Sequence, residues 1–151
     1  MEFPEKVASF FKSRKVVLVM TLEDSGTIHS AVKGILEVNP KEGKILLVDL
    51  YSGQTLRNLR NNPAVHITAI DEQRFEGYAL QGTASITPHD KIHEDFIRKW
   101  QDHITKRISE RIVASVRSGK KSKKIFEAHL AMKPQYMIEV KADTVVDLSP
   151  R

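Results

Sequence analysis

The residues from Ser52 to Pro63 hold the clearest pattern for binding a charged ligand. Ser52 and Thr55 have hydroxyl groups of the kind that cap the first amides of a helix, and Gly53 lets the backbone approach a ligand closely. The unpaired amides of such a helix start and the positive end of its dipole favour an anion, and Arg57 follows one turn later. Two interpretations remain open from these residues alone, a capped connecting helix and an anion site.

Two histidines form the other arrangement that could do chemistry. His89 and His93 are four residues apart, a spacing that can place both imidazoles on one helical face for a metal, but no third ligand accompanies them. We therefore expect no metal site. The chain has no cysteine, which excludes disulfides and thiolate chemistry, and no Gly-x-Ser-x-Gly motif of a hydrolase. We expect no catalytic side chain, so that redox chemistry would come from a bound cofactor.

Length and composition predict one folded domain, residues 1–151. The chain has 151 residues, of which 40% are hydrophobic, and this is enough for a substantial core. No apolar run reaches the roughly 18 residues that a membrane helix needs. The N-terminus also lacks the basic and then apolar pattern of a signal peptide. We therefore expect a cytoplasmic protein without membrane contact.

Positive charge is concentrated between Lys106 and Lys124. This stretch has eight basic residues and one acidic residue, so it carries +7, whereas the rest of the chain carries −2. It can be a solvated surface, surround a phosphate-bearing ligand or bind nucleic acid. Neither zinc-finger spacing nor an RNA-binding aromatic motif accompanies it, so we do not expect nucleic-acid binding.

Hydrophobic patterns predict the elements that position these residues. A helix is predicted from residue 3 to residue 14, and residues 15–22 form an apolar run that predicts a strand buried on both faces. A turn leads to a partner strand over residues 27–38. Alternation along this strand separates two faces, of which one carries Ile28, Ser30, Val32 and Gly34 and the other carries His29, Ala31, Lys33 and Ile35.

Four more strands are predicted after these, over residues 44–50, 64–71, 75–87 and 136–148. Glycines at positions 77 and 82 would let the fifth strand bend or bulge. A last strand that rejoins the sheet would close a small barrel and remove its exposed edges.

The region between the fifth strand and the last one is predicted to be helical. Apolar residues recur every four positions from Ile92 to Val116, and this spacing drifts by about 40° per step against a turn of 3.6 residues. We therefore predict two helical pieces or a bent helix, broken between His103 and Lys106. A further short helix is predicted over residues 123–132.

Four segments of the sequence resemble the flavin-binding split-barrel family related to pyridoxamine 5′-phosphate oxidase. These segments are the strand from Val16 to Thr21 with its turn at Asp24 to Gly26, Ile28-His29-Ser30-Ala31-Val32, Ser52-x-x-Thr55-x-x-Asn58-Leu59-x-x-Asn62-Pro63-x-Val65, and Gly77-Tyr78-x-Leu80-x-Gly82-x-Ala84. The match spans residues 15–87, and the tail from residue 133 to residue 150 is similar to the closing strand of the family. The resemblance implies a mainly β fold, a six-stranded split β-barrel with peripheral α-helices.

The resemblance also implies a cofactor and a partner. Such proteins hold flavin mononucleotide (FMN) at the interface of a homodimer, with the ring against the second strand and the phosphate near the helix start. By position, the ring or ribityl chain would contact Ser30, Ala31 and Val32, and Asp49 and Leu50 would line the site. The phosphate would contact Ser52, Gln54 and Thr55, with positive charge from Lys33, Arg57 or a partner subunit.

The resemblance leaves several functions open. The first is a flavoprotein oxidoreductase that transfers electrons or hydride between a reduced nicotinamide and a small acceptor. The second is a non-enzymatic flavin carrier or sensor, and the third is a relative that binds a deazaflavin or haem. Many relatives have a lysine or arginine where this chain has Gln54, which is the reason for the third. The C-terminal tail lacks the Trp and Arg-Leu elements of the true oxidases, so vitamin oxidation is not expected.

Overall fold

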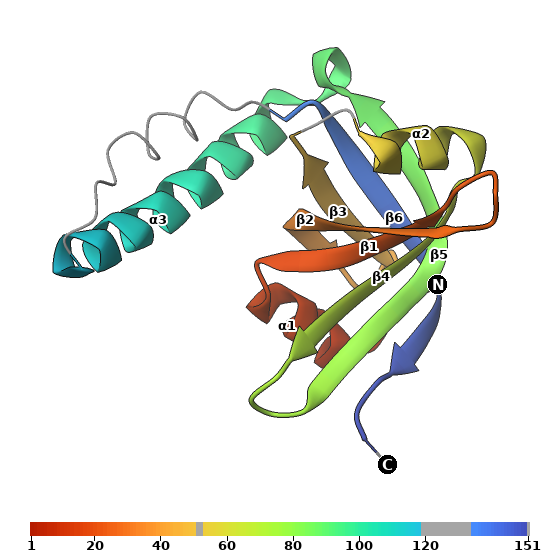
Figure 1. Cartoon of the computed structure of the whole chain (residues 1–151), viewed down its shortest axis with the longest axis horizontal. Helices are drawn as coiled ribbons and strands as arrows, with labels where there is room; N and C mark the ends of the chain where they lie inside the picture. The colour runs from red at the N-terminus through yellow and green to blue at the C-terminus, as the bar shows by residue number, and fades with distance from the viewer. Residues whose placement is uncertain (51–52, 119–133, 151) are drawn as a thin grey trace.

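The computed structural model describes residues 1–50, 53–118 and 134–150 (Figure 1). The helices in order are α1 (Glu5–Ser13), α2 (Gln54–Asn61), the 3-10 helix η1 (His89–Lys91) and α3 (Glu94–Ser118). The strands are β1 (Val16–Leu22), β2 (Ile28–Asn39), β3 (Lys44–Asp49), β4 (Ala64–Asp71), β5 (Glu76–Pro88) and β6 (Tyr136–Asp147). The predicted helix at 123–132 lies outside the described residues.

The six strands form a closed antiparallel barrel in the order β1-β2-β3-β6-β5-β4. The last strand, β6, inserts between β3 and β5 and thereby closes the sheet. The sheet has an irregularity next to Gly82, but the extra residue is Asp143 of β6, since Gln81 pairs with Thr144 and Gly82 pairs with Ala142. A Cβ atom at Gly82 would overlap the carbonyl oxygen of Lys141, so only glycine fits there. The structure confirms the mainly β, six-stranded split barrel with peripheral helices.

Two apolar clusters hold the fold together. The first fills the barrel and includes Phe11, Leu47 and Ile138, which have no exposed surface. The second lies outside the barrel wall, where Trp100 of α3 packs with Leu36 and Met137. Trp100 also contacts the backbone at Gly34, where a Cβ atom would approach its ring to 3.3 Å. The second cluster fixes the first turns of α3 to the barrel.

The outer face of β1 is exposed, and the prediction of a strand buried on both faces is wrong. Burial alternates along β1, with Val17, Val19 and Thr21 buried in the barrel and Val16, Leu18 and Leu22 exposed on the other face. The apolar run resembles a buried strand because its outward residues are apolar as well. In the described residues no helix covers this face (Figure 1).

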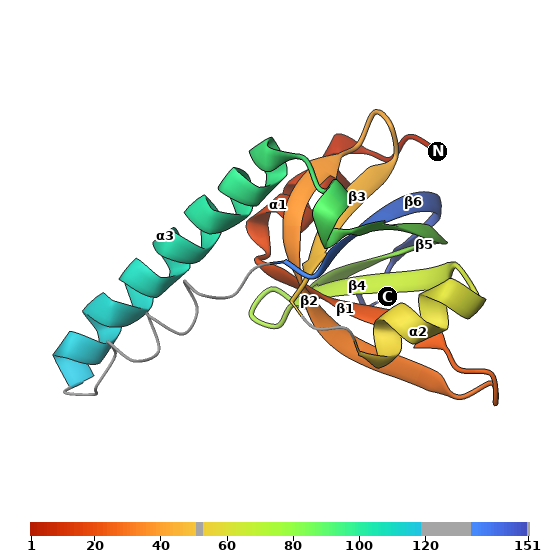
Figure 2. The same ribbon diagram turned by 90° about the horizontal axis from the view of Figure 1, so that it is seen from above.

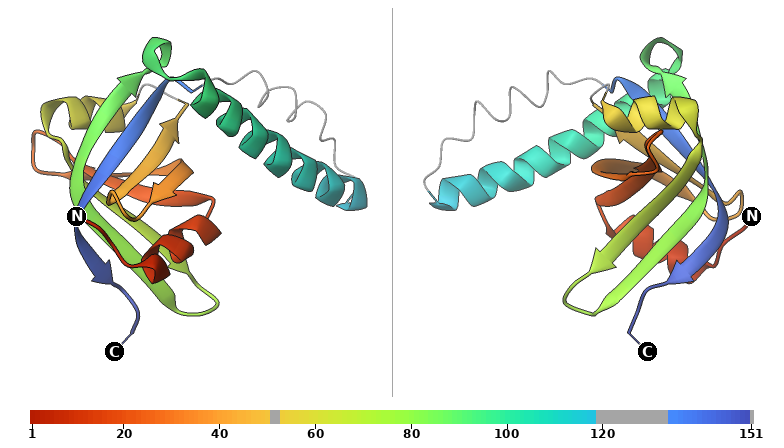
Figure 3. Two further views of the ribbon diagram at one scale, coloured as in Figure 1. Left: turned by 180° about the vertical axis from the view of Figure 1, so that it is seen from behind. Right: turned by 45° about the vertical axis from the view of Figure 1, so that its right-hand side comes forward.

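The region after β5 contains one long helix, so the predicted break between His103 and Lys106 is wrong. α3 runs for 25 residues without interruption. Ile92 precedes it, and its buried anchors are Trp100 and Ile104. Beyond them the helix extends away from the barrel (Figure 3), so the drifting apolar spacing does not have to follow one flat partner surface. Neither α3 nor any other helix in the described part of the chain is long and apolar enough to cross a membrane.

Candidate functional site

The site is built around the first half of β2. Residues 28–33 pair with β1 along one edge, whereas β3 begins to pair with β2 only at Gly34, opposite Val48. No described strand pairs with the other edge of residues 28–33, and backbone groups along such an edge are available to a ligand. Figure 2 shows this hairpin projecting past the barrel beneath α2.

A buried charged cluster lies where β2, β3 and β6 meet. The Lys33 ammonium is 2.7 Å from Oδ2 of Asp49, and the hydroxyl of Tyr136 donates a hydrogen bond to the same oxygen. The Asp49 side chain is 1% exposed and that of Lys33 is 12% exposed. Charges so far from water are costly unless they are paired, so this cluster holds its three groups in one geometry.

Tyr136 stays protonated because of this environment. Burial raises the pKa of its hydroxyl above the ordinary value of 10.0, and the hydrogen bond to Asp49 and the charge of that carboxylate raise it further. The positive charge of Arg60 on α2 opposes these effects more weakly. The phenol therefore acts as a hydrogen-bond donor over the whole physiological pH range.

A chain of hydrogen bonds links α2 to the barrel wall. Oε1 of Gln54 accepts hydrogen bonds from the Arg57 guanidinium, at 2.9 Å from Nη2 and 3.3 Å from Nε. The amide of Gln54 donates to Oδ1 of Asn58 at 2.7 Å, and the Asn58 amide donates to the Thr21 hydroxyl of β1 at 3.0 Å. This chain fixes a cationic side chain within the first turn of α2.

The start of α2 differs from the predicted cap. The N-cap residue is Gly53, and no side chain caps the helix there. Thr55 is fully buried, and its hydroxyl has no hydrogen-bond partner among the described residues. The predicted capping role of Thr55 is therefore wrong, because the helix turns its side chain into the protein and away from the helix end. Ser52 lies outside the described residues.

The other predicted site residues lie in several environments. Ser30 and Val32 are on the exposed outer face of β2, whereas Ala31 and Lys33 are on its half-buried inner face. This confirms the predicted division of β2 into two faces. Leu50, next to Asp49 in the chain, packs with the cluster under α3.

Tyr136 belongs to the charged cluster but was not among the predicted site residues. Tyr136 shares a buried face of β6 with Ile138 and Val140. Nothing in the sequence pairs Tyr136 with Asp49, since the two residues are 87 positions apart and meet only when β6 joins β3.

The outer face of the same hairpin is apolar. Six large hydrophobic residues of β1, β2 and β4 are exposed there, namely Val16, Leu18, Leu22, Ile28, Val32 and Ile70. The register places Leu18 opposite Val32 and Leu22 opposite Ile28, with Met20 opposite Ser30 between the two pairs. We call the surface formed by the six apolar residues the outer apolar face. A cavity of about 600 Å³ borders it, lined in part by Met20, His66 and Gln81. Contiguous exposed apolar surface of this kind marks an interaction site.

The two histidines at 89 and 93 do not share a helical face. His89 lies in η1, where its Nδ1 is 2.6 Å from the carbonyl oxygen of Pro134. His93 precedes α3 and lies 3.4 Å from the carboxylate of Asp95. Among the described residues no group of three or more His, Asp or Glu side chains could hold a metal.

The sequence matches a family model over residues 3–143, and that model is described as pyridoxamine 5′-phosphate oxidase. The chain belongs to this family. Among solved structures, HupZ of Group A Streptococcus is similar, with a TM-score of 0.64 and 15% identity over 97% of this chain and 94% of that one. General stress protein 26 from Bacillus anthracis str. Sterne has a TM-score of 0.60 and 15% identity, with 97% and 94% coverage.

Another similar structure is an F420 reductase, with a TM-score of 0.59 and 14% identity over 95% of this chain and 98% of that one. At these identities the structures establish the fold alone. No curated protein matches the sequence. Family and structure thus agree on the split barrel.

Proposed function

We propose that the protein binds FMN at the interface of a homodimer and transfers electrons or hydride between a reduced nicotinamide and a small acceptor. The observation that carries this proposal is the position of the buried Lys33–Asp49–Tyr136 cluster beside the unpaired edge of β2. Membership of the pyridoxamine 5′-phosphate oxidase family supports the proposal.

The residues present suit a phosphorylated cofactor. Free backbone amides at the start of α2 favour an anion. Gln54 itself supplies no charge, but it holds the Arg57 guanidinium by two hydrogen bonds, and a guanidinium retains further donors for phosphate oxygens. We assign the phosphate contact to this helix start and to Arg57, with Ser52 as a further contact. The buried hydroxyl of Thr55 does not take part.

The two faces of β2 have different tasks in this proposal. The backbone edge of residues 28–33 would bond to polar atoms of the flavin ring, beside Ala31 and Lys33. The outer apolar face, which includes Val32, would be covered by a second copy of the chain. Ser30 would then lie between the two subunits. A second copy is the occupant that we favour because a hydrophobic patch on a soluble domain is stable only when it is covered.

When bound, FMN would supply the redox chemistry. The chain would bind and orient it and exclude water from one side. Lys33 would add positive charge near the ring, and Asp49 and Tyr136 would hold that ammonium in place. No side chain is assigned a proton transfer.

A deazaflavin is the second candidate cofactor. The F420 reductase shares the fold of this chain, and Gln54 stands where many relatives have a cation. Haem is the third candidate cofactor. A non-enzymatic flavin carrier or sensor would use the same site without a substrate.

The test is the absorption spectrum of the purified protein after incubation with FMN and removal of the excess on a sizing column that also reports mass. We expect one FMN per subunit on a dimer. Riboflavin should bind at least tenfold more weakly, since it lacks the phosphate. Incubations with F420 and with haem test the second and third cofactors, and oxidation of reduced nicotinamide by the loaded protein distinguishes an enzyme from a carrier.

Two variants locate the site. Lys33→Met and Arg57→Met should each weaken FMN retention, and only Arg57→Met should reduce the preference for FMN over riboflavin. The matched control is Arg98→Met, at an exposed arginine of α3. A protein that retains no FMN, or equal losses in all three variants, would contradict this site.

A further inference from the structure

A basic groove lies between the C-terminal end of α1 and the barrel end of α3. Its walls carry six basic side chains, namely Lys12, Arg14, Lys15, Lys99, His103 and Lys106. Residues 35–38 of β2 form its floor, and its volume is about 480 Å³. None of the residues assigned to the flavin site lines this groove, so it is a separate feature of the molecule.

The fold itself creates this groove. A register shift between Ile35 and Glu37 interrupts the pairing of β2 with β3. Ile35 there packs into the barrel core, and Leu36 packs into the cluster under α3. α1 and α3 flank this part of β2, on the same side of the barrel (Figure 2). The lining residues of α3 recur at i, i+4 and i+7, so one face of the helix supplies all of them.

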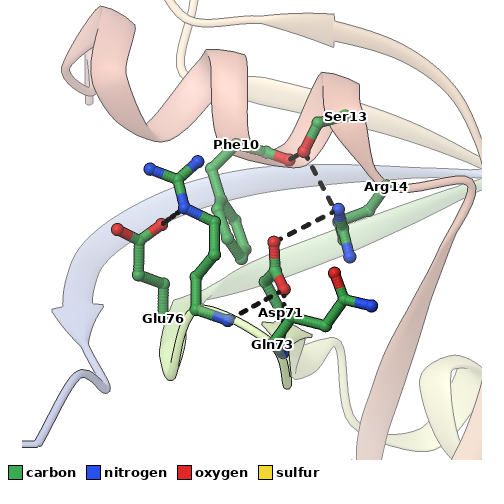
Figure 4. A network of polar contacts seen from close by, with 7 residues as sticks. Phe10, Ser13, Arg14, Asp71, Gln73 and Glu76 are labelled. Atoms are coloured by element: carbon green, nitrogen blue, oxygen red, sulfur yellow. Dashed lines mark hydrogen bonds and ion pairs between the residues drawn. The ribbon is translucent and has the colours of Figure 1, made fainter.

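The charges of the groove are only partly balanced. Glu37 is the one carboxylate among the described residues that line it, and it lies 3.9 Å from Lys99. Two further carboxylates approach from outside, where Glu5 lies 3.8 Å from Lys12 and Asp71 lies 3.6 Å from Arg14. Figure 4 shows Arg14 drawn toward Asp71. Even with Lys15 and His103 left aside, the four cations Lys12, Arg14, Lys99 and Lys106 outnumber these three carboxylates.

The ion pairs present would not prevent a ligand from binding. Each has a separation of 3.6–3.9 Å at a partly or fully exposed position. Exposed pairs of this kind contribute at most about 1 kcal/mol, so the lysine side chains can turn toward a ligand at small cost. Ile35 and Leu36 are buried, so the apolar surface of the floor comes from the half-buried Val38.

We propose that this groove binds a small organic phosphate with two or more negative charges, of the nucleotide type. The phosphates would lie between the cations of α1 and α3, and the flat organic part would lie on the apolar floor. The volume is within the range of small-ligand sites, about 300–1,000 Å³. Lys12 and Arg14 on one wall and Lys99 and Lys106 on the other suit a phosphate dianion. This site is independent of the proposed flavin site.

The test is isothermal titration calorimetry with ADP and with inorganic pyrophosphate, at low salt and at physiological salt. We expect saturable binding of one ADP per chain. The double variant Lys99→Glu/Lys106→Glu should weaken it at least tenfold, and Lys12→Glu on the opposite wall should weaken it several-fold. The matched control is Lys41→Glu/Lys91→Glu, which changes the net charge equally at exposed positions outside the groove and should change the affinity less than twofold.

Further measurements separate this site from the flavin site. Arg57→Met and the double variant Lys33→Met/Asp49→Leu should leave ADP binding unchanged, and circular dichroism should show that these variants and the groove variants are folded. Equal losses in the groove and control variants would overturn the proposal, because they indicate general surface charge. Absence of saturation by ADP and pyrophosphate would also overturn it. So would binding only to single-stranded oligonucleotides with affinity that rises with length, since that indicates a polyanion surface.

Discussion

The two faces of the β1–β2 hairpin invert the usual distribution of side chains. The face turned toward the barrel and α2 holds Lys33 in a buried ion pair with Asp49. The face turned away from the barrel exposes Leu18, Ile28 and Val32. Folding alone favours the opposite arrangement, since burying charge costs free energy and burying apolar surface gains it. In the proposed function, the inner face binds the cofactor and the outer face binds a second subunit.

The two faces also differ in how completely this chain satisfies them. The inner cluster has its partners within one chain, because Asp49 accepts from both Lys33 and Tyr136. The outer apolar face has no partner among the described residues. Substitutions on the inner face should therefore change the stability of the single chain, whereas substitutions on the outer face should change its association.

The largest effect is expected on the inner face. Asp49→Ala would leave the Lys33 ammonium buried without its carboxylate, and the free energy of unfolding should fall by about 3–5 kcal/mol. Urea denaturation measures this loss. The double variant Lys33→Met/Asp49→Leu should recover most of the stability, because it removes both charges. Its affinity for FMN should nevertheless stay below that of the parent. A single Asp49→Ala variant as stable as the parent would show that the ion pair does not hold this face together.

The next effect is expected on the outer face. Val32 is 64% exposed in the single chain, so Val32→Asp should leave the fold intact. In the proposed dimer it would place a carboxylate in an apolar interface and remove about 1.5–3 kcal/mol of burial, which weakens association about tenfold to more than 100-fold. Light scattering over a concentration series measures this change.

The control for the outer face is Phe75→Asp. Phe75 is 74% exposed in the β4–β5 turn and has a positive φ of 52°, a conformation that Asp tolerates. Phe75→Asp should therefore leave the oligomeric state unchanged. A monomeric parent protein, or a dimer that Val32→Asp does not weaken, would contradict the assignment of this face to a second subunit.

A smaller effect concerns pH and the inner face. The pKa of Tyr136 is raised in the folded state, so folding favours its protonated form. The resulting contribution to the free energy of unfolding is fully present below the ordinary tyrosine pKa of about 10, and it is lost as pH rises through the folded pKa. Above pH 10, the loss of this contribution should therefore lower the free energy of unfolding of the parent by up to about 1.4 kcal/mol per pH unit. Denaturation of the parent and of Tyr136→Phe at pH 9 and pH 11 measures it. Parallel pH profiles for the two proteins would show that Tyr136 has no such role.

The smallest effect is expected at Thr55. Its hydroxyl is buried without a hydrogen-bond partner among the described residues, so Thr55→Val, which keeps the shape and removes the unpaired group, should raise the free energy of unfolding by about 1 kcal/mol. FMN affinity should not change. Thermal denaturation and FMN titration provide the two measurements. A loss of stability would restore the capping role that the sequence pattern predicts.

Local patterns were sufficient to predict most of the fold. Alternation and turn residues placed all six strands within a few residues of their observed bounds, and the glycine at 82 marks a close approach to the backbone of Lys141 on β6. Strands and turns depend on residues close together in the sequence, because backbone preferences and the alternation of side chains are local properties. The prediction of a break in the long helix was wrong because the apolar spacing does not indicate how much of the helix packs on the barrel.

The features of the candidate site also fall into those that local sequence determines and those that depend on tertiary structure. The sequence by itself determined that Lys33 and Ala31 share one face of β2, that Ser30 and Val32 share the other, and that Arg57 lies one turn into α2. Only the tertiary structure decided that Asp49 pairs with Lys33 and Tyr136, that Thr55 turns inward, and that β1 leaves its apolar outer residues exposed. Periodicity determines which side chains share a face, but the partner of each face is set by strands and helices distant in sequence, and these meet only when the barrel closes.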